Sequence, residues 1–125
     1  MQCTVQVIEI SKQGKWFLQS DAKLWLDNSA VDASSVSIDF SGSEPGWQTD
    51  AGFYAAGVVF PVLHGKFGED GAIQGLLEIM NVPYVSSSIL GSAVATNKAV
   101  CKKLLQQANI NVVDYKYFFT NNSKI

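Results

Sequence analysis

The pattern of hydrophobic and polar positions divides the chain near Gly57 into a strand-rich first part and a second part where strands alternate with helices. β-branched residues dominate 3–10, and the turn SKQGKW separates them from KWFLQ, which predicts a β-hairpin. Residues 20–35 fit a short helical turn or an irregular strand, followed by a polar loop. SVSIDF at 35–40 predicts a weak strand, and the glycines and proline of 41–52 predict a surface loop.

After Gly57 the chain reads as a βαβ unit over 58–86. The apolar run VVFPVLH has the length of a strand buried on both faces of a parallel sheet, and Pro61 fits there only at a bulge or an edge. The short strand VPYVS closes the unit. The segment between them is helical, with Asn81 as its C-cap and one apolar face formed by Ile73, Leu76, Leu77 and Met80.

Two more helices and a last strand are expected in the final third. The first helix covers about 88–95, and Thr96 or Asn97 caps the second, which stops at Asn109. DYKYFF, from 114, predicts a strand. The second helix places three apolar residues on one face: Val100, Leu104 and Leu105.

Composition indicates one globular domain of 125 residues, with 47% hydrophobic and 16% charged residues. The net charge of -2 and the sequence pI near 5.2 argue against nucleic-acid binding, and three lysines at 98, 102 and 103 are too few to change that. No apolar stretch has the length of a membrane span, and the start lacks the pattern of a signal peptide. Cys3 and Cys101 form no metal-binding or redox spacing, so we expect reduced thiols in a cytoplasmic protein.

The candidate chemistry begins with His64, the chain's one histidine, at the end of the predicted strand and followed by Gly65. Ligands of open α/β sheets bind beyond the carboxyl ends of strands, although a histidine bonded to its own loop fits equally well. HGKFGEDG is glycine-rich but lacks the P-loop pattern, and its two acids oppose a phosphate. Glu69 suits an ammonium group, or a lysine or histidine that needs orienting; otherwise Glu69 and Asp70 simply complement the dipole of the helix that follows.

Lys98 lies in the first turn of the last helix, where a cation is unfavourable unless an anion binds nearby. A solvated surface lysine is the alternative, and Lys102, one turn later, would extend an anion-facing strip. Ser92 lacks a nucleophile elbow, and one histidine with scattered acids gives no metal-ligand spacing.

The order of these segments resembles the N-terminal region of bacterial D-alanine-D-alanine ligases, which are ATP-grasp enzymes. The resemblance rests on VFPVLHGKFGEDGAIQGLLEIMNVPYV, ILGSAVATNK and KKLLQQANINV, continuous over residues 57 to about 113, and on the hairpin VQVIEISKQGKWFL. It implies an α/β, three-layer sandwich with a mainly parallel sheet, a pre-ATP-grasp, Rossmann-like N-terminal domain. Residues 1–113 would be that substrate-binding domain, and 114–125 the start of the strand into the ATP-grasp lobe.

The resemblance also implies a chemistry: ATP phosphorylates the carboxylate of one D-alanine, and the amine of a second attacks the acyl phosphate, making the dipeptide of peptidoglycan. His64, Gly65 and Glu69 would then bind the substrate, and Lys98 the ATP phosphates. Gly65, Gly68 and Gly71 would let the loop approach the ligand. Mg²⁺ or Mn²⁺ would assist through ligands outside this chain, and a cytoplasmic homodimer is implied.

Two departures from the family's pattern affect the activity that we expect. The family's first strand with its acidic loop would precede residue 1, and the lobes with the transition-state arginine would follow 113, so no catalytic residue is assigned and the chain alone is expected to be inactive. The alternatives are a stand-alone ligand-binding or dimerisation module, and a ligase joining D-alanine to D-lactate or D-serine.

Overall fold

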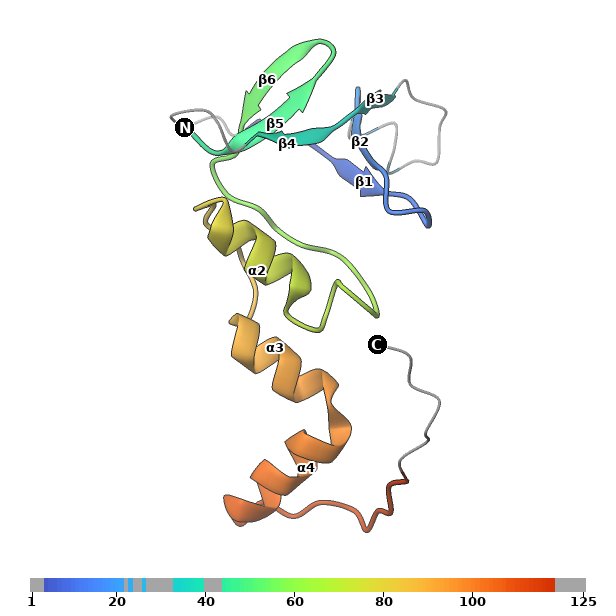
Figure 1. The fold of residues 1–125 in the computed structure, drawn as a ribbon, viewed down its shortest axis with the longest axis vertical. Helices are drawn as coiled ribbons and strands as arrows, with labels where there is room; N and C mark the ends of the chain where they lie inside the picture. Colours follow the sequence, from blue (N-terminus) through green and yellow to red (C-terminus); the bar gives the residue numbers. More distant parts are fainter. Residues whose placement is uncertain (1–3, 22, 24–25, 27–32, 40–43, 119–125) are drawn as a thin grey trace. The chain divides into compact units, whose positions relative to one another are not determined.

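A computed structural model of the protein describes residues 4–21, 23, 26, 33–39 and 44–118. The chain forms two compact units: one comprises 1–59 with 78–83, and the other 60–77 with 84–125 (Figure 1). The predictions that concern Cys3, most of 22–32 and 119–125 lie outside the described residues.

The first sheet of the first unit contains the predicted hairpin. β1 (Ile8–Ile10), β2 (Trp16–Gln19) and β3 (Ala33–Ser35) pair antiparallel in the order β1-β2-β3, with Ile8 opposite Leu18. Gly14 has φ 77° in the turn, a left-handed conformation that favours glycine. The hairpin prediction is therefore confirmed.

The second sheet occupies a region where we expected a loop. β4 (Ser37–Asp39), β5 (Gly46–Thr49) and β6 (Gly52–Ala55) are antiparallel in the order β4-β5-β6, so the surface-loop prediction for 41–52 is wrong at β5 and β6. Trp47 is 4% exposed, and its ring centroid lies 5.7 Å from that of Trp16. The glycines and the Thr49 hydroxyl, which accepts from Ala51 N at 3.1 Å, shape a tight turn between two strands.

The apolar run from 58 is extended but uncovered. Val58, Phe60 and Val62 are 63%, 69% and 71% exposed, alternating with half-buried neighbours. The amide of Val59 donates to the carbonyl of Pro83 at 2.8 Å, so the two segments that we predicted as strands of a βαβ unit are hydrogen-bonded to each other at this point. The mixture of strands and helices fits the α/β class. All strand pairs among the described residues are antiparallel, so the mainly parallel sheet is not confirmed there.

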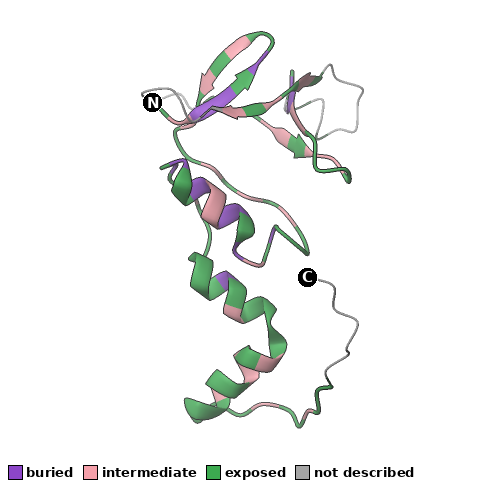
Figure 2. Ribbon diagram, viewed as in Figure 1, coloured by how far each residue is buried: buried purple, intermediate pink, exposed green. Residues whose placement is uncertain are grey.

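Helix α2 (Ala72–Ile79) confirms the predicted apolar face. Leu77 is 0% exposed, Ile73 and Met80 are buried, and Leu76 is half-buried (Figure 2). Asn81 has φ 55° just after the helix, which supports the C-cap prediction.

Helices α3 (Ile89–Thr96) and α4 (Lys98–Gln107) have the expected caps but little burial. Asn97 Oδ1 accepts from Val100 N at 3.1 Å, so Asn97 rather than Thr96 caps α4, and Asn109 follows the helix end with φ 58°. No residue of α4 is buried; its predicted apolar face is largely exposed, with Leu104 at 52% (Figure 2). No helix in the described ranges combines the length and apolar character needed to cross a bilayer.

The strand predicted at DYKYFF does not form within 114–118. Instead, the Tyr115 hydroxyl donates to Gln106 Oε1 at 3.2 Å, and Lys102 Nζ lies 4.7 Å from the centre of the Tyr115 ring. Lys103 Nζ similarly lies 5.0 Å from the Tyr117 ring. Aromatic residues that we expected to occupy a sheet are held by cations and a side chain of α4.

Candidate functional site

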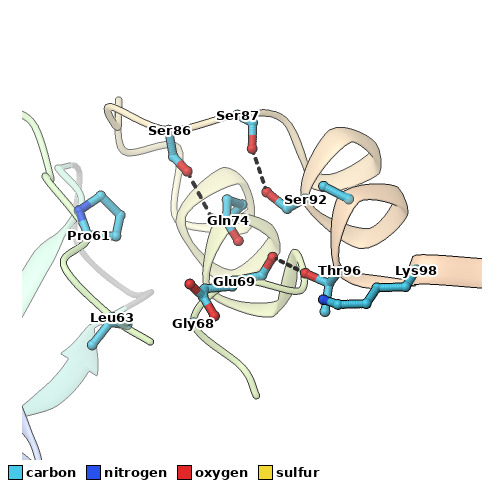
Figure 3. Close-up of a pocket in the computed structure, with 11 residues that line it drawn as sticks. Pro61, Leu63, Gly68, Glu69, Gln74, Ser86, Ser87, Ser92, Thr96 and Lys98 are labelled. Carbon is cyan, nitrogen blue, oxygen red and sulfur yellow. Dashed lines mark hydrogen bonds between the residues drawn. The ribbon is translucent and has the colours of Figure 1, made fainter. Parts of the chain in front are cut away.

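A pocket of about 430 Å³ lies within the second unit (Figure 3). Its walls come from four places: the extended segment before the glycine-rich loop, the loop with α2, the serine segment before α3, and the junction between α3 and α4. The lining residues are Pro61, Leu63, Gly68, Glu69, Gln74, Ser86, Ser87, Ser92, Ala95, Thr96 and Lys98.

Glu69 is the acidic group of this pocket. Its Oε2 accepts from the amide of Gly65 at 2.6 Å, and its Oε1 lies 3.8 Å from His64 Nδ1. The carboxylate side chain is 54% exposed, so it closes the loop while part of it still faces solvent. The structure therefore brings together the three residues that we predicted to bind the substrate: His64, Gly65 and Glu69.

His64 and Gly65 lie beside the pocket rather than in its wall. The imidazole is 91% exposed, and neither residue is among those that line the pocket. His64 can thus act on a ligand directly only at the rim, or through its contact with Glu69.

Asp70 has a different function from the helix-dipole role considered from the sequence. Its carboxylate accepts from Phe67 N at 2.9 Å and from Ala72 N at 3.2 Å, and the helix begins only at Ala72, so neither acid lies in its first turn. These two bonds, the one from Phe67 first, lower the pKa of Asp70 below its usual 3.8. Asp70 holds the loop in shape and leaves Glu69 to the pocket.

Two glycines of the loop, Gly68 and Gly71, are required by contacts within the protein. A Cβ at Gly68 would lie 2.6 Å from Leu63 Cβ, and one at Gly71, which has φ +96°, would lie 2.8 Å from the carbonyl of Ile89. Both positions exclude a side chain, and these contacts keep the acidic loop close to the start of α3.

Lys98 lines the opposite side of the pocket as the first residue of α4. It is exposed, and within the described part of the chain no ion pair joins it to Glu69. Both charges consequently remain available to a ligand. Lys102 lies over the Tyr115 ring and does not line the pocket, so the predicted anion-facing strip does not extend to it.

None of the five uncharged polar side chains in the pocket wall was predicted from the sequence as a binding residue: Gln74, Ser86, Ser87, Ser92 and Thr96. Gln74 Nε2 donates to Ser86 Oγ at 3.0 Å, and the hydroxyls of Ser87 and Ser92 share a 2.8 Å hydrogen bond (Figure 3). A signal for Gln74 was present, because it stands next to Ile73 on the buried face of α2, where a polar residue is unusual.

Metal and thiol chemistry receive no support from the described residues. Within 4–21, 23, 26, 33–39 and 44–118, no three His, Cys, Asp or Glu side chains converge, so we assign no metal ligand there. Cys101 is a half-buried free thiol outside the pocket.

The sequence profile of a family described as "D-ala D-ala ligase N-terminus" matches residues 1–87. The chain belongs to this family. It is 39% identical over 127 residues to the D-alanine–D-alanine ligase of Treponema pallidum, covering 94% of this chain, and 38% identical over 120 residues to that of Coxiella burnetii, covering 89%.

Solved structures of ligases agree with this family assignment. The D-alanine-D-alanine ligase of Coxiella burnetii superposes with a TM-score of 0.71 over 87% of this chain, and the VanG D-Ala:D-Ser ligase of Enterococcus faecalis with 0.70 over 84% at 32% identity. The chain spans about a third of each of these ligases: 32% of the two relatives compared by sequence, and 33% and 32% of the two solved chains.

Proposed function

We propose that this chain is the N-terminal, substrate-binding part of an ATP-dependent D-alanine–D-alanine ligase. Residues 1–113 form that domain, and 114–125 lead into the next lobe of the longer protein. The observation that carries the proposal is the pocket in which Glu69 and Lys98, from separate segments, present opposite charges that are not paired with each other. The match of residues 1–87 to the D-alanine–D-alanine ligase N-terminal family agrees with this proposal.

The two charges suit a cationic group of one ligand beside Glu69 and an anionic group of another beside Lys98. Glu69 attracts the ammonium group of the first D-alanine. His64 and Gly65 hold the carboxylate of Glu69 in place. Lys98 meets phosphate oxygens of ATP, which offsets the cost of a cation at the start of α4. ATP supplies the phosphoryl group that converts the D-alanine carboxylate into a good acceptor for the second amine.

The metal belongs elsewhere in the protein. The family resemblance implies that Mg²⁺ or Mn²⁺ would be held by ligands outside this chain. The 125-residue chain alone is expected to be inactive.

The mainly parallel, three-layer order is also part of this proposal. Val58, Phe60 and Val62 expose alternating apolar side chains, as a strand does when one of its faces lacks a covering layer. In the longer protein this segment pairs into a parallel sheet. A cytoplasmic homodimer is the assembly that we expect.

A D-alanine–D-serine ligase is a second candidate, favoured by the similarity to VanG at 32% identity. The chemistry of the first amino acid is the same in both, and only the acceptor differs. D-lactate as acceptor, or a non-catalytic binding module, would be the outcome if neither reaction is seen.

The test is phosphate release from ATP by the complete natural protein with D-alanine, against L-alanine as control. We expect release with D-alanine and a product with the mass of the dipeptide. Phosphate release only when D-serine or D-lactate is added would mean that this compound is the acceptor. No phosphate release with D-alanine, D-serine or D-lactate would reject the ligase proposal. The 125-residue chain, assayed in parallel, is expected to release none.

A further inference from the structure

Gln74 stands out in the pocket wall because half of its amide has no partner. The residue is 2% exposed, and its Nε2 donates to Ser86 Oγ at 3.0 Å. Its Oε1 is buried and has no hydrogen-bond donor among the residues that the structure describes. In the view of Figure 3 this oxygen points away from Ser86. Buried polar atoms in folded proteins are nearly always hydrogen-bonded, so an acceptor in a pocket wall calls for a donor from a ligand.

The neighbouring groups determine which kind of donor fits. Glu69 lines the same pocket and adds a second acceptor, this one negatively charged. A carboxylate or phosphate placed between these groups would face lone pairs on both sides, whereas a primary ammonium offers three donors and a positive charge. Lys98 supplies the one cation among the lining residues and disfavours an ammonium at the α3–α4 junction. The ammonium therefore belongs on the α2 side.

We propose that Gln74 is a further substrate-binding residue, whose Oε1 accepts a hydrogen bond from the ammonium group of the D-amino acid beside Glu69. This inference rests on the proposed function. Ser86 accepts the hydrogen bond from Nε2 in this structure, which leaves the Gln74 oxygen as the end of the amide that can accept from a ligand. The pair Gln74–Ser86 thereby selects a ligand that carries an amine.

The experiment compares Gln74→Met and Gln74→Glu in the complete natural protein, measuring KM for D-alanine and for ATP separately. Met keeps the length of the side chain without an acceptor, and we expect D-alanine KM to rise about tenfold with ATP KM unchanged. Glu keeps an acceptor and adds charge, so D-alanine KM should stay at or below the wild-type value. Gln107→Met makes the same chemical change at an exposed position outside the pocket and should alter neither constant.

Each result has a defined meaning. An unchanged D-alanine KM in Gln74→Met, or an equal rise in both KM values, overturns the role of Gln74. If Gln74→Met fails to fold, Gln74→Glu decides alone. A D-alanine KM more than about threefold above wild type would mean that the Gln74 side chain acts as a donor or only supports the fold. In that case the new carboxylate gains no bond from the ammonium group and only repels Glu69. Wild-type phosphate release with D-alanine is measured first, and its absence rejects the proposed function itself.

Discussion

The hydroxyl of Thr96 donates a 2.8 Å hydrogen bond to the backbone carbonyl of Glu69, 27 residues earlier (Figure 3). This bond connects the acidic loop to the end of α3, two residues before Lys98. Two other segments are joined similarly by Gln74 with Ser86 and by Ser87 with Ser92. The charged groups of the pocket are therefore positioned by neutral polar side chains.

Thr96→Val is expected to disturb the spacing of the two charges without removing either. Losing one hydrogen bond should lower the free energy of unfolding by about 1 kcal/mol, and the displaced Glu69 should raise the KM for D-alanine several-fold in the complete protein. Thr96→Ser retains the hydroxyl and should restore both values. Thr4→Val, at an exposed position in the other unit, is the control. Equal KM values for the valine and serine variants would exclude the positioning role.

His64→Ala tests the rim of the pocket. The imidazole lies 3.8 Å from Glu69 but is 91% exposed, so solvent screening weakens their attraction. We expect a modest, two- to fivefold rise in D-alanine KM, and a larger rise for Glu69→Gln, which also weakens the bond from Gly65. D-alanine kinetics of His64→Ala identical to wild type would remove His64 from the site.

Lys98→Met separates ligand binding from stability. Removing a cation from the N-terminus of α4 should leave the free energy of unfolding unchanged or raise it by about 0.3–1 kcal/mol at most. The KM for ATP should rise about tenfold or more. Lys102→Met is the matched control, because Lys102 packs on Tyr115 outside the pocket; it should lower stability and leave ATP KM unchanged. ATP KM that is raised equally in both variants would argue against a phosphate contact at Lys98.

The sequence predicted the helices well because local signals determine them. The apolar spacing of α2 and the capping residue Asn97 act within one or two turns. The sheet was less predictable, since strand pairing depends on distant partners. The glycine-rich sequence around the turn at Asp50–Ala51 indicated a loop, and the packing of Trp47 beside Trp16 is visible only in the structure. Phe60 belongs to an apolar run that we expected to be buried, but its side chain is exposed in the described chain.

The site divides in the same way. Glu69 and Lys98 were identified as candidates because a charge at a helix start or in a glycine-rich loop is visible in one segment. Their meeting in one pocket depends on Thr96 reaching across 27 residues, and no short motif encodes that contact. Gln74 was detectable as a polar residue on an apolar face, yet its free acceptor is defined only by the structure.

Acid should reveal the part that Asp70 plays in the loop. Hydrogen bonds from Phe67 N and Ala72 N to its carboxylate lower its pKa in the folded protein below 3.8, the value expected when unfolded. The folded state therefore binds this proton less readily, so the stabilisation by Asp70 is complete above the unfolded pKa of 3.8 and is lost as pH falls through the lower, folded value.

Asp70→Asn is thus expected to be less stable than wild type at neutral pH, and the difference in melting temperature should shrink as the pH falls below about 4. Asn retains an oxygen acceptor but carries no charge, so the variant isolates the charged part of the two backbone bonds. Asp114→Asn, at an exposed position outside the loop, should match wild type at every pH. Melting temperatures of wild type and both variants, measured between about pH 2.5 and 7, check this expectation. A constant difference between Asp70→Asn and wild type over that range would mean that the carboxylate's charge contributes nothing to the loop, and that its bonds act only through geometry.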